Sequence, residues 1–565
     1  MKRRNMAISV LTVLLILAAV SIEKNELSKQ DFPFSVMVTS DGYEKKISCV
    51  EMHGGYYVFL PAYVEPSAVK ICPNSMYDVF IGDQLLSEEM NCGQFPLDMP
   101  LELFFHKSGG NPESTVTFFQ SKNVGTVYID VKSGNMEYIH RKKGNGEGGR
   151  IQVYDAAGSL WHQGELKSIR GRGNATWAFD KKPYSITLKN ASDLLGLDAA
   201  EEWILLSNAA DPSQLRNKIV YDLASEIGLS FSPESRWADL YLNGEYAGLY
   251  LLTERNEIHP QRVAITPDGF LVSLELENRL QSQNYPYVRT AYGTILRIHQ
   301  SGMSKDSLQT IWESAENAIF AEDGIDPRTG KAWTELIDLD SWARKYLLEE
   351  LVGNYDAGSV SQYFYYDQDV GKIFAGPVWD MDNTMGADNW TKASNAILAG
   401  RIHMWSDEDA PLFYELLKKD AFMERVIEQY WSDCRPALER LCDSELDAYS
   451  EYLSAAQRMN WKRWPQIAWK TDTETIRSYL QARMSFMDCY LENKADYVTV
   501  SAWMPYYIWS SWALLPGEIL EPLPEEEGFV WCDLETGLPY EFGIPVDRNM
   551  ILQLKNLEEL EGETQ

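Results

Sequence analysis

The chain has 565 residues, of which 45% are hydrophobic and 12% aromatic, and its formal net charge at pH 7 is −32. This length exceeds what one hydrophobic core supports, and the apolar content offsets the ordering entropy that keeps polar chains disordered, so we expect several globular units. The negative charge repels phosphate backbones and anionic lipid surfaces, which excludes nucleic acid as an expected partner.

The N-terminus has the pattern of an export signal. Lys2, Arg3 and Arg4 precede an apolar run over residues 6–22. A basic start followed by an apolar stretch is typical of secretion signals, but this run is slightly short for a bilayer span. We therefore expect residues 1–30 to be either a cleaved signal peptide or an uncleaved membrane anchor, and the protein to be extracellular or at the cell surface.

Residues 31–112 alternate apolar and polar positions in short runs, for example at 34–38 and 56–60, with Gly and Pro between the runs. Alternation with a period of two is typical of half-buried strands. This pattern predicts an N-terminal β-sandwich-like domain over 31–112, which we interpret as a spacer.

Residues 113–496 are predicted to form one larger domain whose pattern changes along the chain. Strands come first, and Asn243-Gly244 is a strong hairpin signal between two of them. Apolar residues recur every four positions after Asp211-Pro212, which predicts an amphipathic helix over 212–227. Later the pattern is mostly helical, interrupted by a predicted strand pair within 363–378.

The tail, residues 497–565, returns to a strand pattern with Pro, Gly and acidic turns. Its turns at Gly517-Glu518, Gly528-Phe529 and Thr536-Gly537 resemble a short extracellular repeat of Gram-positive surface proteins. The resemblance implies a β-rich binding or spacing module.

A glycine-containing loop lies between two predicted strands, with the sequence Arg170-Gly171-Arg172-Gly173-Asn174. Glycines let backbone N–H groups approach phosphate oxygens, and the arginines add positive charge. A plain hairpin turn explains the same residues equally well.

Two lysines, Lys181 and Lys182, follow this loop and precede an alternating strand. A lysine at the start of a strand after a glycine loop can reach the α and β phosphates of a nucleotide. Exposed lysines at strand starts are also common without such a role.

Three aspartates form the third group of candidate residues. Asp356 lies in a predicted loop, and Asp380 and Asp382 follow an apolar strand two positions apart. Neighbouring carboxylates repel each other unless a cation lies between them, and magnesium binds a few carboxylates together with phosphate oxygens and water. The alternatives are a helix cap and a calcium site.

The serial order of these features is that of protein kinases: glycine loop, strand lysine, helix, hairpin, loop aspartate, strand pair and metal-type aspartate. Several motifs in this order resemble the CotH kinase family, over roughly residues 125–495. They are the segments 164–177, 182–186, 203–208, 215–218, 242–254 and 379–382.

The resemblance implies a secreted or spore-associated atypical protein kinase that uses ATP and Mg²⁺ to phosphorylate Ser on coat proteins. It implies that Asp356 is the catalytic-loop aspartate and that Lys182 contacts phosphate. Asp380 and Asp382 would bind the metal, with Gln362 as the candidate amide ligand. Cofactor contacts would come from Arg170, Gly171, Arg172, Gly173, Asn174, Lys182 and Glu254.

The chain also departs from the usual kinase pattern. No His-Arg pair precedes Asp356, the nearest amide Gln362 follows it by six positions instead of five, and the Asp-Phe-Gly triplet is absent. The carboxylate partner of Lys182 is expected on the helix over 212–227, where Asp222 and Glu226 are both candidates.

The sequence thus predicts an α+β fold with a bilobal, atypical protein-kinase-like core over 113–496, made of a β-rich N-lobe and a helical C-lobe between small β-rich domains. The expected function is an exported, ATP- and magnesium-dependent protein kinase that phosphorylates Ser or Thr of surface or coat proteins. The alternative is a non-catalytic surface adhesin or envelope scaffold with a kinase-like fold.

Overall fold

The computed structural model describes residues 32–76, 78–106, 113–277, 279–280, 284–354, 356–387, 397, 399, 412–467, 473–492, 497–504, 507–524 and 526–557. The expected signal or anchor over 1–30 lies outside these residues. The chain forms two compact units: the described residues up to Leu60 with Val64–Phe119, and Pro61–Tyr63 with the described residues from Gln120 onward. No described helix is both long and apolar enough to cross a membrane.

The first unit consists of two β-sheets, with strand orders β2-β1-β5 and β3-β4-β9-β8-β6-β7. Apolar side chains of these strands, such as Val36 and Phe59, form its core. Because β9 pairs with β8, the unit continues past residue 112 to Phe119. The strands are β1 (Phe34–Ser40), β2 (Tyr43–Ser48), β3 (Val50–Met52), β4 (Gly55–Leu60), β5 (Lys70–Pro73), β6 (Asp78–Ile81), β7 (Gln84–Leu85), β8 (Pro100–His106) and β9 (Glu113–Gln120).

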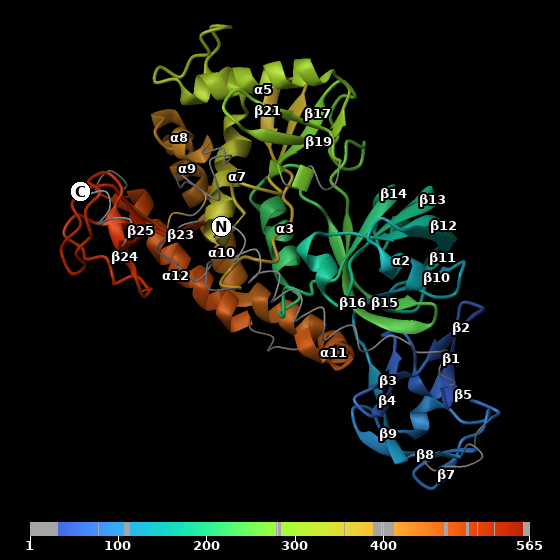
Figure 1. Cartoon of the computed structure of the whole chain (residues 1–565). Helices are drawn as coiled ribbons and strands as arrows, with labels where there is room; N and C mark the ends of the chain where they lie inside the picture. Colours follow the sequence, from blue (N-terminus) through green and yellow to red (C-terminus); the bar gives the residue numbers. More distant parts are fainter. Residues whose placement is uncertain are drawn as a thin grey trace. The chain divides into compact units, whose positions relative to one another are not determined.

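The second unit begins with a closed barrel in the strand order β10-β11-β12-β13-β14-β16-β15 (Figure 1). Val127, Ile129, Ile186 and Trp203 belong to its buried core, as expected for strands with one apolar face. The predicted hairpin at Asn243-Gly244 is confirmed, since it joins β15 and β16. The elements are β10 (Gly125–Val131), α2 (Glu137–Arg141), β11 (Gly146–Tyr154), β12 (Leu160–Gly171), β13 (Tyr184–Leu194), β14 (Leu197–Leu206), β15 (Ser235–Leu242) and β16 (Glu245–Glu254).

A five-stranded sheet of order β18-β19-β17-β20-β21 follows the barrel, and β20 and β21 confirm the strand pair predicted within 363–378. Trp312 of α5 and Trp342 of α7 both contact Phe364 of β20, so the two helices pack on this sheet. The elements are β17 (Phe270–Leu274), β18 (Tyr287–Arg289), β19 (Ile295–Ser301), α5 (Lys305–Phe320), α6 (Trp333–Leu336), α7 (Leu339–Val352), β20 (Tyr363–Asp367) and β21 (Lys372–Ala375).

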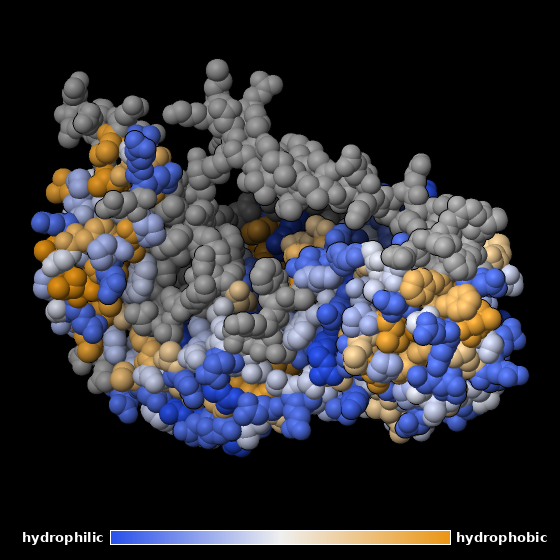
Figure 2. Space-filling model, turned by 90° about the horizontal axis from the view of Figure 1, so that it is seen from below, coloured by the Kyte–Doolittle hydropathy of each residue, from blue (hydrophilic) through white to orange (hydrophobic). Residues whose placement is uncertain are grey.

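The remaining chain is helical and then returns to strands, so the fold is mixed α+β, as predicted. Figure 2 shows one face of the molecule, on which hydrophobic side chains lie in separate patches among hydrophilic ones. The last sheet has the order β23-β22-β25-β24. The elements are α8 (Leu412–Leu416), α9 (Asp420–Gln429), α10 (Arg435–Arg440), α11 (Leu446–Arg463), α12 (Thr473–Glu492), β22 (Val498–Met504), β23 (Tyr507–Leu514), β24 (Phe529–Asp533) and β25 (Met550–Asn556).

Helix α3 (Arg216–Glu226) begins later than the predicted start at residue 212. The Asp211 carboxylate accepts hydrogen bonds from the backbone N–H groups of Ser213, at 3.0 Å, and Arg216, at 2.9 Å. Gln214 has a φ of +62°, which no α-helix contains. Asp211 therefore closes a tight turn before the helix instead of capping a helix that starts at Pro212.

Candidate active site

A cleft of about 1040 Å³ in the second unit is lined by the barrel, the five-stranded sheet and the segment 379–383 of the loop after β21. We call this segment, which carries Asp380 and Asp382, the acidic loop. The whole chain carries a net charge of −32, but Lys and Arg outnumber Asp and Glu on the cleft lining. Such a local excess of cations favours an anionic ligand. The cations are Lys142, Lys143, Arg170, Arg172, Arg255, Arg279 and Arg297, and the carboxylates are Glu202, Glu275, Asp356, Asp380 and Asp382.

All residues of the predicted glycine loop, 170–174, line this cleft. A Cβ atom on Gly171 would lie 2.2 Å from the Trp177 ring, so only glycine fits there. Gly173 has a φ of +79°, a conformation that glycine adopts without strain, and its carbonyl accepts a hydrogen bond of 2.8 Å from Lys143 Nζ. At its two glycines the loop thus presents backbone without side chains, and Lys143 lies beside Gly173.

Arg172 links the glycine loop to the acidic loop. Its guanidinium lies 5.2 Å from the centre of the Trp379 ring, and the nearby charge of Asp380 opposes the lowering of the Arg172 pKa by burial. An arginine stays protonated in such a setting. Among the described residues no acceptor hydrogen-bonds this guanidinium, so its donors are available to a ligand.

The acidic loop brings several carboxylates together. Asp380 accepts a hydrogen bond of 3.1 Å from Ser361 Oγ and has a φ of +66°. Burial, and then the charges of Asp380, Asp211 and Asp356, raise the pKa of Asp382 to about 8. This crowding of negative charge is the condition that a bound cation relieves.

The arrangement suits a cation that takes only part of its ligands from the protein. Within the described parts of the chain, no group of three or more His, Cys, Asp and Glu side chains is placed to hold a metal ion. Magnesium binds through one or two carboxylates and completes its shell with water and substrate phosphates. Asp380 and Asp382, which both line the cleft, fit this donor set.

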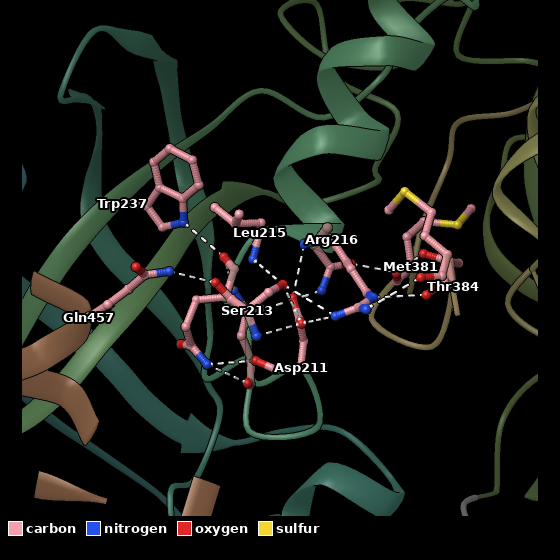
Figure 3. A network of polar contacts seen from close by, with 12 residues as sticks. Asp211, Ser213, Leu215, Arg216, Trp237, Met381, Thr384 and Gln457 are labelled. Carbon is pink, nitrogen blue, oxygen red and sulfur yellow. Dashed lines mark hydrogen bonds and ion pairs between the residues drawn. The ribbon is translucent and has the colours of Figure 1, made fainter. Parts of the chain in front are cut away.

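Helix α3 holds the acidic loop in place through the polar network in Figure 3. Arg216 donates from Nε to the Thr384 carbonyl at 2.8 Å and pairs with the buried Asp211 carboxylate at 2.6 Å. The next residue, Asn217, accepts a hydrogen bond of 2.8 Å from the Met381 backbone N–H. Two adjacent helix residues therefore fix the backbone that carries Asp380 and Asp382.

A buried amide positions the other aspartate. The side-chain oxygen of Asn354 accepts a hydrogen bond of 3.1 Å from the Asp356 N–H, and its Nδ2 donates to Glu349 and contacts Met381 Sδ at 3.6 Å. Glu349 in turn pairs with Lys345 at 2.5 Å inside α7. Asn354 therefore connects the end of α7 with the Asp356 loop and the acidic loop.

The sequence model of the CotH kinase protein family matches residues 169–487. The chain belongs to the CotH kinase family. The match runs from β12 to α12 and includes the glycine loop, Asp356 and both aspartates of the acidic loop, so the predicted resemblance is confirmed. Most of the cleft lining lies in the matched part of the chain, and Lys142, Lys143 and Gly144 precede it.

A curated protein and a solved structure are also similar to parts of this chain. Inner spore coat protein H of Bacillus subtilis (strain 168) is 26% identical over 228 residues, which are 39% of this chain and 59% of that protein. The chain thus spans about three fifths of the length of this curated relative. The crystal structure of the Helicobacter pylori proinflammatory kinase CtkA aligns with 55% of this chain and 95% of its own, at 12% identity and a TM-score of 0.24.

Lys182 is placed differently from its predicted position with Asp356 and Asp380. Its ammonium donates a hydrogen bond of 2.8 Å to the Trp177 carbonyl and lies 5.2 Å from that ring, and Lys182 is not among the described residues that line the cleft. Lys181 is buried and donates to the Ser207 carbonyl at 2.7 Å. Within this CotH family fold, both ammonium groups are therefore held by backbone carbonyls.

Two further predicted residues, Glu254 and Gln362, are not among the described cleft residues. The Glu254 carboxylate accepts a hydrogen bond of 3.0 Å from the Glu234 N–H, and burial raises its pKa to about 7. Gln362 is buried, and its side-chain amide has no hydrogen-bond partner among the described residues. Its neighbours Ser361 and Tyr363 both line the cleft.

Neither expected partner of Lys182 faces it. Asp222 binds Lys218 of its own helix and accepts a hydrogen bond of 2.6 Å from the Tyr449 hydroxyl. Glu226 pairs with Arg440 of α10. These carboxylates connect α3 to other helices and do not serve the cleft.

Several cleft residues were missed by the sequence reasoning. Lys143 adjoins Gly144 in a Gly-rich stretch, and Arg255 directly follows the hairpin motif that ends at Glu254, so both had a weak local signal. Arg297 had none. It reaches the cleft from β19, with its guanidinium 3.4 Å from the centre of the Tyr285 ring.

Proposed function

We propose that this chain is a magnesium-dependent phosphotransferase that moves the γ-phosphoryl group of ATP to a Ser or Thr hydroxyl of a protein. The observation that carries the proposal is the single cleft lined by the glycine loop, Asp356, Asp380 and Asp382. Membership of the CotH kinase family supports the same reaction class.

The phosphates of ATP would bind on the cationic side of the cleft. Arg170, Arg172 and Lys143 supply the positive charge, and the backbone at Gly171 and Gly173 allows close approach of phosphate oxygens. Arg172 would take the role predicted for Lys182, because Arg172 lines the cleft and the Lys182 ammonium donates a hydrogen bond to the Trp177 carbonyl.

Asp380 and Asp382 would hold the magnesium ion, which would neutralise the negative charge of the phosphates. The raised pKa of Asp382 is consistent with this assignment, because after burial its causes are the charges of Asp380, Asp211 and Asp356, which a bound cation would neutralise. Arg216 and Asn217 keep both carboxylates in place before the ligand binds.

Asp356 would orient the acceptor hydroxyl and take its proton. The acceptor oxygen forms a bond to the γ-phosphorus, the bond from that phosphorus to the bridging oxygen breaks, and ADP leaves with the electron pair. Positioning and charge stabilisation supply most of the rate in this reaction class, which suits a cleft with fixed backbone and many charges.

We also propose the bilobal arrangement and the setting of the protein. The barrel formed by β10–β16 would act as the β-rich lobe and the helices from α5 to α12 as the helical lobe, and the family match covers parts of both. The acceptor would be a surface or coat protein outside the cell. The spore-coat name of the Bacillus subtilis relative supports this setting.

The direct test is transfer of labelled phosphate from ATP by the full chain and by Asp356→Asn. Loss of a general base costs about 10²- to 10⁴-fold, so incorporation into the chain itself or into an added coat-protein mixture should fall by that factor. Asp369→Asn is the matched control, because Asp369 is exposed in the β20–β21 turn. Equal incorporation by Asp356→Asn and the wild type would overturn the assignment.

A second candidate is a non-catalytic binding protein that keeps the cleft. The placement of Lys182 at the Trp177 carbonyl favours it, since the strand lysine of active kinases contacts the nucleotide phosphates. This candidate predicts that the wild type binds nucleotide but incorporates no more phosphate than Asp356→Asn.

A further inference from the structure

A second cavity, of about 510 Å³, lies in the second unit and shares no lining residue with the cleft. It is bounded by the start of β10, the turn after β11, β15, α3 and α11. Four aromatic residues contribute to its wall: Trp161, Trp237, Tyr449 and Tyr452. The proposed phosphotransfer does not use any of these residues.

The rings form a fixed surface that is open to solvent on one side. Trp237 contacts Tyr449 edge-on at 5.7 Å and Tyr452 at 6.0 Å between ring centres. Trp161 and Tyr452 are 45% and 43% exposed, which is high for such large side chains. Trp161 donates to Asp193 at 2.6 Å and Tyr449 to Asp222 at 2.6 Å, so the polar atoms of these two rings are already bonded.

The charges around the rings leave an excess of negative charge. Both cations of the lining have carboxylate partners: Lys218 binds Asp222, and Arg236 lies 3.6 Å from Glu234. Of the two lining carboxylates, Glu445 makes no hydrogen bond or ion pair with the described residues. The other, Asp155, accepts only backbone hydrogen bonds from its own turn among those described.

We propose that this cavity binds a small organic cation of the quaternary or alkylammonium class. Aromatic faces attract such cations through their quadrupole, and a nearby unpaired carboxylate adds charge attraction while the rings replace water around the alkyl groups. The cavity already brings a cation against this surface, because the Lys218 ammonium lies 5.9 Å from the centre of the Trp237 ring. A metal ion fits less well, since Asp155 and Glu445 are the two carboxylates among the described lining residues and a hard cation needs more oxygen ligands.

The test is calorimetric titration of the full chain with choline, compared with its uncharged isostere 3,3-dimethylbutan-1-ol, at matched ionic strength. Choline should bind and saturate at one site per chain, and the isostere should bind at least about threefold more weakly, because it buries the same methyl groups but lacks the charge. Equal affinity for both compounds, or no choline binding at millimolar concentration, would overturn the proposal.

Two variants locate the site without changing the buried core. Trp161→Leu and Glu445→Gln should each weaken choline binding by about threefold to thirtyfold, since each removes one source of attraction. Trp431→Leu and Glu451→Gln are matched controls, because both residues are exposed and lie outside the cavity. Choline binding that survives both cavity variants, or that falls equally in the controls, would show a different site and refute this one.

Discussion

Asp356 owes its position to a side chain that never touches the cleft. Asn354 is buried, accepts a hydrogen bond from the Asp356 N–H, and donates to Glu349. A buried amide bonded on both sides resists movement, because each lost bond would leave an unpaired polar group. Asn354 is therefore a positioning residue for the proposed reaction.

Replacement Asn354→Ala should lower kcat of phosphate transfer by about 10²-fold through a small displacement of Asp356. The KM for ATP should change little, because the phosphate-binding side chains are untouched. Asn190→Ala, at an exposed position of β13, is the control. Steady-state kinetics of both variants check this, and a large rise in KM with unchanged kcat would contradict the positioning role.

The buried carboxyl group of Asp239, inside the barrel, has a shifted pKa. Burial raises its pKa to about 7, although Tyr246 donates a hydrogen bond of 3.0 Å to it and the charge of Lys181 favours its ionised form. The folded protein therefore keeps the proton on Asp239 over a range of pH in which the unfolded chain has already lost it. Stability linked to this group is present at low pH and is lost as the pH rises.

The free energy of unfolding should fall as the pH rises from about 4 to 7, by at most on the order of 4 kcal/mol from this group. Asp239→Asn removes the titrating proton, so the variant should lack this part of the slope. Urea titrations at several pH values measure it, with the exposed Asp268→Asn as control. An unchanged slope in Asp239→Asn would show that another group causes it.

At the scale of elements, α3 connects the cleft to helices α10 and α11. Its first residues, Arg216 and Asn217, bind the acidic loop, and its later carboxylates, Asp222 and Glu226, bind Tyr449 and Arg440. Figure 1 shows α3 between the barrel and the long helices α11 and α12. A change in this helix should therefore affect both stability and the cleft.

Arg216→Ala should lower the free energy of unfolding of the second unit by about 3–5 kcal/mol, because it leaves the buried Asp211 carboxylate without its partner. Arg440→Ala is the matched control. It removes a solvent-exposed pair with Glu226 and should lower the free energy of unfolding much less than Arg216→Ala does. Urea unfolding followed by tryptophan fluorescence compares the two, and equal losses would contradict the role of the network in Figure 3.

The elements that the sequence predicts well are those with a local cause. Asn243-Gly244 specifies a hairpin, and the strand pair at β20 and β21 follows from alternation and Gly371. The start of α3 was missed because Asp211 bonds to Arg216, a contact that periodicity does not report. Lys182 was expected in the cleft because of its place in the sequence pattern. That pattern does not reveal the hydrogen bond from its ammonium to the Trp177 carbonyl.

At the scale of the whole molecule, charge is divided unevenly. The net charge of −32 opposes the approach of ATP, yet the cleft collects cations from distant parts of the chain, such as Lys143, Arg172 and Arg297. The sequence pattern does not reveal this excess of cations, because only folding brings these side chains together. It does reveal the two ends of the site, the glycine loop and the acidic loop, because each is a contiguous motif.

Thermal unfolding of the full chain tests the proposal that this cleft binds ATP together with magnesium. Unfolding temperatures are compared with and without ATP, in magnesium or in a chelator, for the wild type and for Asp380→Ala. A ligand that binds the native state at 100 times its Kd stabilises it by about 2.7 kcal/mol. We expect a rise in unfolding temperature that needs both ATP and magnesium and is lost in Asp380→Ala. No shift in the wild type at millimolar ATP with magnesium, or an equal shift in Asp380→Ala, would contradict it.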